Sequence, residues 1–250
     1  MKKLFILWMA LIGSWGSLVA LSFENQPIKA MIFDCDGVLV DTEYLKYLAW
    51  RESLFTQGID FTIEDYMPMV GNVGKTMLRM ISQLKKKEIP EELVQLKNAK
   101  YHSLQKQGVL PIQPIVDFAN YLAQNKDKLG IKVALASSAR KEEILTNLRQ
   151  VGLEKAFDLI ISGHDDLDAY VDAEGKNKPK PYIYVEAAKR LDIPSSQCIV
   201  FEDTTAGIEA AAGAGMIAVA VPNRFTLQQD FSKAKKVIAS HEELQQILQK

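Results

Sequence analysis

The stretch AMIFDCDG, residues 30–37, decides how this sequence folds. Its first four residues form an uninterrupted apolar run, which is typical of a strand covered on both faces in a parallel sheet. Two aspartates, Asp34 and Asp36, follow that run directly. Gly37 permits a tight turn that lets both carboxylates face the same side. The stretch therefore predicts a buried strand that ends in an acidic site.

The same pattern, a short apolar run followed by a helical stretch, repeats along the chain. Apolar side chains recur at helical spacing between the runs, and the helix near residue 145 is expected to end at Gly152. This alternation of strands and helices predicts an α/β fold, a doubly wound, Rossmann-like parallel sheet with right-handed crossovers. The expected strands are 30–33, 132–136, 158–161, 198–201 and 217–221, with a short sixth at 237–238, and the expected helices are 144–151, 181–191 and 204–212.

The interval between the first and second strands is too long for a single crossover helix. One apolar helical face is formed by Met77, Leu78, Ile81 and Leu84, and residues 91–107 predict another helix. We therefore expect a helical cap at 45–112, inserted into a core made of 23–44 and 113–250.

Composition narrows the classes of protein that fit. The 250 residues suffice for one large domain or for a domain with an insert. Hydrophobic residues make up 48% and charged residues 24%, which is ordinary for a globular protein. The formal net charge of -1 lacks the basic excess of proteins that track nucleic acid, so nucleic acid is not an expected partner.

The first 22 residues depart from this ordinary composition. Two lysines precede an apolar run from Leu4 to Leu21, and the run ends in the small-x-small pattern Ala20-Leu21-Ser22. Residues 1–22 therefore predict a secretory signal peptide, with export to the periplasm or beyond. The same run is long enough for an uncleaved membrane anchor. A third interpretation is an extended start on a cytoplasmic enzyme.

An exported chain can form disulfides, but the only cysteines are Cys35 and Cys198. Cys35 follows the end of one expected strand and Cys198 begins its expected neighbour. Their offset along the strands corresponds to roughly 20 Å, whereas a disulfide needs Cα atoms within about 7 Å. We expect two free thiols.

Polar side chains gather where the expected strands end. They are Asp34 and Asp36 after the first strand, Ser137 and Ser138 after the second, Lys178 in the loop after the third, and Glu202 and Asp203 after the fourth. Ligands of open α/β sheets bind at these carboxyl ends. Carboxylates that meet there require a cation, and an oxygen-only set without thiolate or histidine favours Mg²⁺ over zinc. A simpler interpretation makes some of these residues helix caps, which is compatible with metal binding.

These motifs, in this order, resemble those of the haloacid dehalogenase superfamily. DCDGVLVDTE, residues 34–43, resembles the first motif, Ser137 the second, Lys178 the third and Glu202-Asp203 the fourth. The match extends over about residues 28–222, and the insert is similar to the family's helical caps. Within the superfamily, the chain is similar to the group that contains β-phosphoglucomutase and sugar-phosphate phosphatases.

The resemblance implies a Mg²⁺-dependent phosphatase that acts on a small organic phosphate monoester, for example a sugar phosphate. Asp34 would attack phosphorus and become an aspartyl-phosphate, and Asp36 would act as general acid and base. Ser137 and Lys178 would hold the phosphoryl oxygens. The implied ligands of Mg²⁺ are the Asp34 side chain, the Asp36 main-chain carbonyl, Asp203 and Glu202, the last directly or through water.

Two lysines of the cap are candidates for substrate contacts. Lys75 lies in the loop that covers the active site in this family, and Lys46 stands where the β-phosphoglucomutase pattern has a histidine. That pattern also has an arginine where this chain has Gly74. Both departures weaken the alternative of a sugar-phosphate mutase. A second alternative, a non-catalytic binding protein on the same fold, predicts a lost nucleophile or metal ligand, and none is lost.

Overall fold

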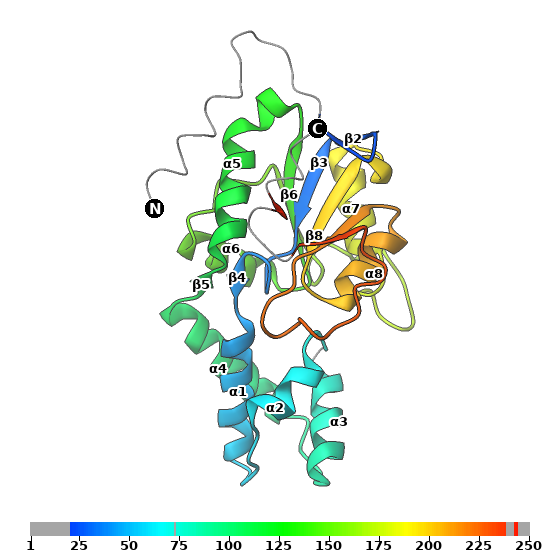
Figure 1. Ribbon diagram of the computed structural model, residues 1–250. Coiled ribbons are helices and arrows are strands. Elements are labelled where there is room, and N and C mark those ends of the chain that lie inside the picture. Colours follow the sequence, from blue (N-terminus) through cyan, green and yellow to red (C-terminus); the bar gives the residue numbers. More distant parts are fainter. Residues whose placement is uncertain (1–20, 73, 239–242, 245–250) are drawn as a thin grey trace.

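The computed structural model describes residues 21–72, 74–238 and 243–244 (Figure 1). The expected leader therefore lies outside the described residues, except for Leu21 and Ser22. Leu21 is buried, and its carbonyl accepts a hydrogen bond from the Ile28 amide at 2.9 Å. Ser22 belongs to a small antiparallel hairpin, β1 (Ser22–Phe23) and β2 (Gln26–Pro27). Within the described ranges, we find no helix with the length and apolar character needed to cross a bilayer.

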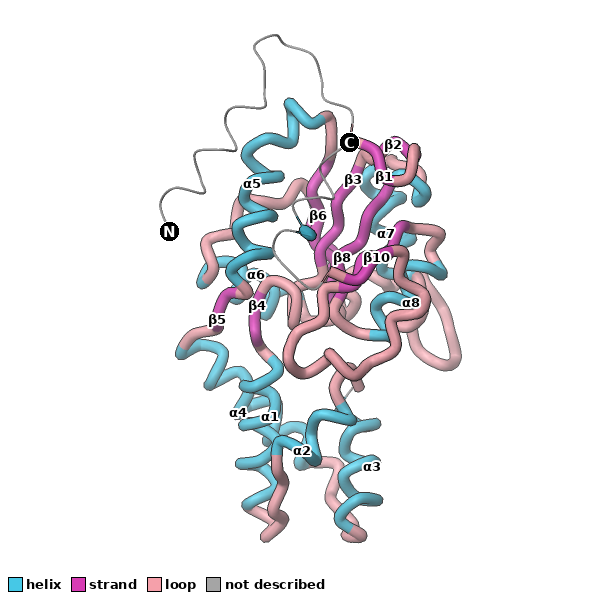
Figure 2. Tube along the Cα trace, in the orientation of Figure 1, coloured by secondary structure: helices cyan, strands magenta, loops and turns pink. Residues whose placement is uncertain are grey.

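The predicted doubly wound parallel sheet is confirmed. Its strands run in the order β10-β9-β8-β3-β6-β7, and every neighbouring pair is parallel. Figure 2 shows the strands of the sheet in magenta, with helices on both sides. Each of the six expected strands is present, with its ends within one residue of the prediction. They are β3 (Ala30–Phe33), β6 (Lys132–Ser137), β7 (Leu159–Ser162), β8 (Cys198–Glu202), β9 (Ile217–Ala220) and β10 (Lys236–Val237). The chain leaves β3 toward β6 and β7 and returns to β8 on the other side, so the switch point lies between β3 and β8.

Helices cover both faces of the sheet, as the continuous apolar strands require. On one face, α5 (Gln113–Leu129) and α6 (Lys141–Gln150) pack against Met31 and Phe33. On the other face, α7 (Tyr182–Leu191) and α8 (Thr205–Gly213) pack against Ala30 and Ile32. In Figure 1 the first pair lies to the left of the sheet and the second to the right. Successive residues of β3 therefore enter two separate cores.

Short local signals set where these helices begin and end. The Thr204 hydroxyl accepts a hydrogen bond from the Gly207 amide at 3.1 Å and so caps α8. Gly130 ends α5 in the left-handed conformation, with φ at 63°. Pro181 occupies the position just before the first turn of α7. A 3₁₀ turn, η2 (Ser195–Gln197), leads into β8.

The remaining helices form a separate bundle at one end of the molecule (Figure 1). These elements are α1 (Glu43–Phe55), α2 (Ile63–Tyr66), the 3₁₀ turn η1 (Met67–Met69), α3 (Gly74–Lys85) and α4 (Leu93–Gln107). We call this bundle the cap. It has its own apolar core, which includes Trp50, Phe61 and Tyr66. Two chain segments join it to the sheet domain, and they pair as β4 (Val40–Asp41) and β5 (Leu110–Pro111).

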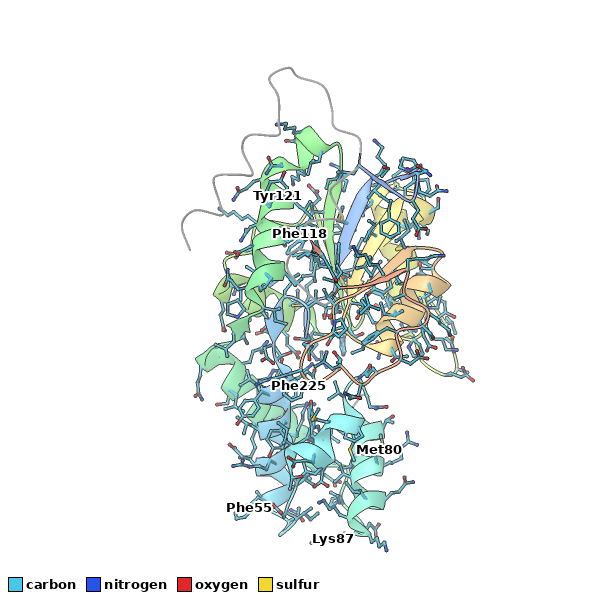
Figure 3. The ribbon with its side chains drawn as sticks, in the orientation of Figure 1. Phe55, Met80, Lys87, Phe118, Tyr121 and Phe225 are labelled. Atoms are coloured by element: carbon cyan, nitrogen blue, oxygen red, sulfur yellow. The ribbon has the colours of Figure 1, made fainter. Side chains whose placement is uncertain are left out.

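One loop of the sheet domain also enters the cap core. Phe225, which follows β9, is buried within the apolar cluster of the cap, and its ring lies edge-on to Tyr66 with centroids 6.4 Å apart. Figure 3 shows Phe225 at the junction between the two parts. The loop that carries it therefore contacts both the cap and, through neighbouring residues, the carboxyl ends of the strands.

Candidate active site

The polar residues predicted at the strand ends meet at the switch point of the sheet. Phe33 pairs with Phe201 on one side and with Leu135 on the other, so Asp34 and Glu202, each one residue further along, lie at the same level. The Asp34 amide donates to the Phe201 carbonyl at 3.0 Å, which continues the ladder to the end of the strand. Adjacent parallel strands thus bring their terminal carboxylates together.

Three buried carboxylates form the centre of the site. Asp34, Glu202 and Asp203 each offer an oxygen, and these oxygens all lie within 4.8 Å of one another. The Lys178 ammonium lies between two of them, 2.6 Å from Asp34 Oδ1 and 2.5 Å from Glu202 Oε1. It also donates to the Ala136 carbonyl at 3.2 Å. One lysine is therefore shared by carboxylates from β3 and β8.

The charges of this group do not balance. Burial raises the pKa of Asp34 to about 7, against the opposing effect of the Lys178 ammonium. Burial, with the negative charges of Glu202 and Asp34, raises the pKa of Asp203 well above its usual range. Although burial opposes it, the neighbouring carboxylates raise the pKa of Lys178 well above the ordinary lysine value. Three acids against one base leave room for a divalent cation, and a buried oxygen-only donor set fits Mg²⁺.

Two glycines make space for these carboxylates. A Cβ atom at Gly37 would lie 2.1 Å from Asp203 Oδ2, and the φ of Gly37 is +83°. A Cβ atom at Gly207 would lie 2.0 Å from the Glu202 carboxylate carbon. Any larger residue would therefore displace an acid of the site. The predicted turn at Gly37 is confirmed, and the need for Gly207 is a feature that the sequence pattern did not reveal.

Asn223 and Tyr184 complete the site, and sequence reasoning missed both. The Asn223 side chain donates to Asp203 Oδ2 at 2.8 Å and to the Gly37 carbonyl at 3.0 Å. The Tyr184 hydroxyl, from α7, donates to Glu202. Asn223 lies in the loop after β9, where the dipeptide Pro222-Asn223 indicates only a turn. Nothing in that turn signal points to a carboxylate partner.

Asp36 lies beside this group but faces different partners. Its Oδ1 accepts hydrogen bonds from the Thr42 hydroxyl at 2.8 Å and from the Asn147 side chain at 3.4 Å. Its Oδ2 faces the Lys46 ammonium at 3.6 Å. Lys46 is held in turn by Glu43 at 2.6 Å. The carboxylates of Asp34 and Asp36 therefore face different partners, Lys178 for Asp34 and Lys46 of the cap for Asp36.

Ser137 is buried at the end of β6, and its hydroxyl accepts a hydrogen bond from the Ala139 amide at 3.2 Å. Ser137 and Ser138 both line the same cavity as Asp34 and Lys178. The structure therefore brings together the six residues predicted for catalysis, phosphate binding and metal binding, three of which are the acids of the central group. These six are Asp34, Asp36, Ser137, Lys178, Glu202 and Asp203.

The cavity has a volume of 450 Å³, and the cap forms its far wall. Lys46, Trp50, Lys97 and Tyr101 line this wall. The Lys97 ammonium lies 5.8 Å from the Trp50 ring centroid and 5.3 Å from that of Tyr101. Burial, together with the nearby Lys46 charge, lowers the pKa of Lys97 to about 8. The cap thus presents two cationic side chains, and sequence reasoning predicted only Lys46.

Lys75, the other cap lysine predicted to meet the substrate, is not among the residues that line this cavity. It lies in the first turn of α3, its side chain is 73% exposed, and it pairs with Glu91 at 2.8 Å. The segment 163–177, which is rich in Asp, Glu and Gly, contributes no acid to the central group, although His164 and Asn177 line the cavity. Its acids are tied to neighbours instead, for example Asp166 to Arg190 at 3.1 Å and Asp172 to Lys180 at 3.4 Å. Across the described ranges, the only metal-sized cluster of acids found is that of Asp34, Glu202 and Asp203.

Both cysteines, Cys35 and Cys198, are buried free thiols, as predicted. Ala30 pairs with Cys198, so Cys35 lies five residues beyond the partner of Cys198 along the neighbouring strand.

Comparisons with known proteins agree with this geometry. A family model described as haloacid dehalogenase-like hydrolase matches residues 28–215. The phosphorylated carbohydrates phosphatase of Thermotoga maritima is 33% identical over 192 residues, which are 76% of this chain and 82% of that protein. The fructose-1-phosphate phosphatase YqaB of Escherichia coli is 30% identical over 192 residues, 76% of this chain and 95% of that protein. The crystal structure of a β-phosphoglucomutase from Clostridium difficile is similar with a TM-score of 0.66 and 30% identity, and the match covers 88% of this chain and 97% of that one.

Proposed function

This chain belongs to the haloacid dehalogenase-like hydrolases and is a phosphoric monoester hydrolase, and from that premise we propose that it is a Mg²⁺-dependent sugar-phosphate phosphatase working through an aspartyl-phosphate. The observation that carries the proposal is the buried trio of Asp34, Glu202 and Asp203 with Lys178 among them. A nucleophilic carboxylate, a cation site and a phosphate-binding ammonium lie together there. These are the parts that phosphoryl transfer requires.

In the first step, a carboxylate oxygen of Asp34 attacks phosphorus in line with the leaving oxygen. The new bond joins Asp34 to phosphorus, and the bond from phosphorus to the sugar oxygen breaks. Asp36 donates its proton to that oxygen, so the sugar leaves as a neutral alcohol. In the second step, Asp36 takes a proton from water, the water oxygen attacks phosphorus, and Asp34 is released with inorganic phosphate.

The rest of the site stabilises the charge of the transferring group. The Lys178 ammonium and the Ser137 hydroxyl would bind phosphoryl oxygens, on which charge spreads in the transition state. Asp34, Asp203 and the Asp36 main-chain carbonyl would hold Mg²⁺, with Glu202 beside them holding Lys178. The bound cation supplies neutralisation of the negative charge on the phosphate ester.

The cap wall suits a small polar substrate. The cavity of 450 Å³ has room for a phosphorylated sugar, and Lys46 and Lys97 face it beside the Trp50 ring. Aromatic faces and charged donors are the groups that bind sugar rings and their hydroxyls or further anions. The two relatives whose names include sugar or carbohydrate phosphates support this class of substrate.

A sugar-phosphate mutase is the second candidate, because the structure is similar to that of a β-phosphoglucomutase. A mutase uses the same aspartyl-phosphate but returns the phosphoryl group to a sugar monophosphate. Lys46 and Gly74 replace residues of the mutase pattern, which favours hydrolysis. Glucose 1-phosphate supplied with a sugar bisphosphate primer distinguishes the two candidates. A phosphatase releases inorganic phosphate, whereas a mutase yields the 6-phosphate.

The function is tested with a panel of phosphate esters, assayed with and without Mg²⁺, using the wild type and Asp34→Asn. We expect Mg²⁺-dependent release of phosphate from at least one sugar phosphate, and no turnover by the variant. Inactivity of the wild type across the panel would contradict the proposed function. Undiminished turnover by Asp34→Asn would contradict the proposed nucleophile.

A further inference from the structure

The carboxylate of Asp36 is fixed by a buried amide pair that links it to the cap. We infer that Asn147 is a positioning residue for Asp36 and that Gln105 of the cap holds Asn147 in its working orientation. This inference rests on the proposed function, because it concerns the acid that protonates the leaving group. Asn147 lies on α6, Gln105 on α4 and Asp36 just beyond β3, so three separate elements meet in one hydrogen-bonded chain.

The chain consists of two consecutive hydrogen bonds. Gln105 Nε2 donates to Asn147 Oδ1 at 2.7 Å, and Asn147 Nδ2 donates to Asp36 Oδ1 at 3.4 Å. Both amides are buried, because Gln105 is only 3% exposed and Asn147 only 1%. A buried amide without partners is costly, so these bonds restrict both side chains.

A main-chain carbonyl, which can only accept hydrogen bonds, fixes the orientation of both amides. Gln105 Nε2 also donates to the main-chain carbonyl of Glu143 at 3.3 Å. A carbonyl only accepts, so the nitrogen of Gln105 must face it. Asn147 therefore presents its oxygen to Gln105 and its NH₂ group to Asp36. Without Gln105, the Asn147 oxygen would lose this donor.

The consequence for Asp36 is a distinction between its two oxygens. Oδ1 accepts from both Asn147 and the Thr42 hydroxyl, which occupies it as an acceptor. Oδ2 is left free of these two donors. That oxygen faces Lys46, a residue that lines the cavity. Asn147 and Thr42 together thus hold the carboxyl group so that Oδ2 is the oxygen that faces the cavity.

The pair also has a matched control on the same helix. The Gln150 side chain bridges α6 to the end of α4, accepting from the Val109 amide at 2.7 Å and donating to the Gln105 carbonyl at 2.9 Å. It supports the same junction between cap and sheet domain. It makes no hydrogen bond to Asp36 among those that the structure shows for Gln150.

The test compares kcat/KM for two substrates in the wild type, Asn147→Leu and Gln150→Leu. One substrate is p-nitrophenyl phosphate, whose leaving group departs without protonation, and the other is the best sugar phosphate of the panel. Because kcat/KM ends at the first irreversible step, it reports the transfer to Asp34 and not the later hydrolysis. Misplacement of a general acid costs roughly 10- to 100-fold on the sugar phosphate.

We expect Asn147→Leu to lose that factor on the sugar phosphate while its kcat/KM for p-nitrophenyl phosphate stays close to the wild type. Gln150→Leu should change both values alike and only slightly. Equal losses on the two substrates in Asn147→Leu, or the same selective loss in Gln150→Leu, would overturn the inference. Should Asn147→Leu fail to fold by circular dichroism, Gln105→Leu carries the same prediction and the same refutation. A wild type that hydrolyses neither ester would instead refute the proposed function.

Discussion

The sharpest test of how the site is built is the substitution Gly207→Ala in α8. Gly207 has an ordinary helical backbone, so helix propensity alone predicts that alanine stabilises the protein by about 1 kcal/mol. The added methyl group would, however, lie 2.0 Å from the Glu202 carboxylate, well inside any normal contact. Glu202 cannot swing away freely, because Lys178 and Tyr184 hold it. Packing and propensity therefore predict opposite signs.

The structure sets the size of the effect. Breaking a buried ion pair costs about 3–5 kcal/mol. Lys178 retains Asp34 at 2.6 Å when Glu202 moves, which places the loss at the low end, about 3 kcal/mol. Subtracting the gain in propensity leaves a net destabilisation of about 2 kcal/mol. For a chain of this size that corresponds to a fall in Tm of roughly 4–8 °C.

Gly213→Ala is the matched control, because Gly213 ends the same helix. A Cβ atom there would lie 3.6 Å from Pro181, an ordinary contact, so this variant should be neutral or slightly more stable. The assay is thermal and urea unfolding of both variants, followed by circular dichroism, together with phosphatase turnover. A Gly207→Ala variant that is as stable and as active as Gly213→Ala would refute the packing argument.

Two further predictions concern the cap wall and the cation site. Lys97→Met should raise KM for an anionic sugar phosphate by about tenfold. A half-buried ion pair between the Lys97 ammonium and the substrate would contribute roughly 1 kcal/mol or more to binding. Because the pKa of Lys97 is lowered to about 8, its positive charge is present below that pH and lost above it. The wild-type KM should therefore rise as the pH passes through about 8, and a KM of Lys97→Met with the same rise would contradict this role. Asn223→Ala should increase the Mg²⁺ concentration for half-maximal activity by about 10–100-fold, because Asn223 orients Asp203, while kcat at saturating Mg²⁺ is largely retained. An unchanged Mg²⁺ dependence, measured by titration of the metal-free protein, would show that Asn223 does not support the cation site.

The strands and their terminal acids could be predicted because one physical rule governs both. An uninterrupted apolar run such as 30–33 must be covered on both faces, and the polar residues that follow parallel strands must share one edge. That reasoning located Asp34 and Asp203 without coordinates. It also placed Lys178 near them, although only the structure shows that this lysine contacts acids of two strands.

Residues whose role depends on the relative position of distant segments could not be found in this way. Lys97 lies on a helix with a largely polar sequence, so its pattern does not tell which face meets the cavity. Asn147 and Gln105 are ordinary helical amides until α4 and α6 are placed together. The paired segments β4 and β5 are each two residues long, too short for any periodicity. Lys75 shows the converse, since its loop position suggested the cavity but the start of α3 directs it to Glu91.

The central claim is that Asp34 is covalently phosphorylated during turnover. The direct measurement mixes the protein with Mg²⁺ and its best sugar phosphate, quenches the reaction in acid within the first turnover, and maps the phosphoryl group by mass spectrometry of peptides. Our account predicts one added phosphoryl group on the peptide that contains Asp34, and none in Asp34→Asn. A phosphoryl group found on a different residue would contradict it, and so would turnover during which Asp34 is never phosphorylated.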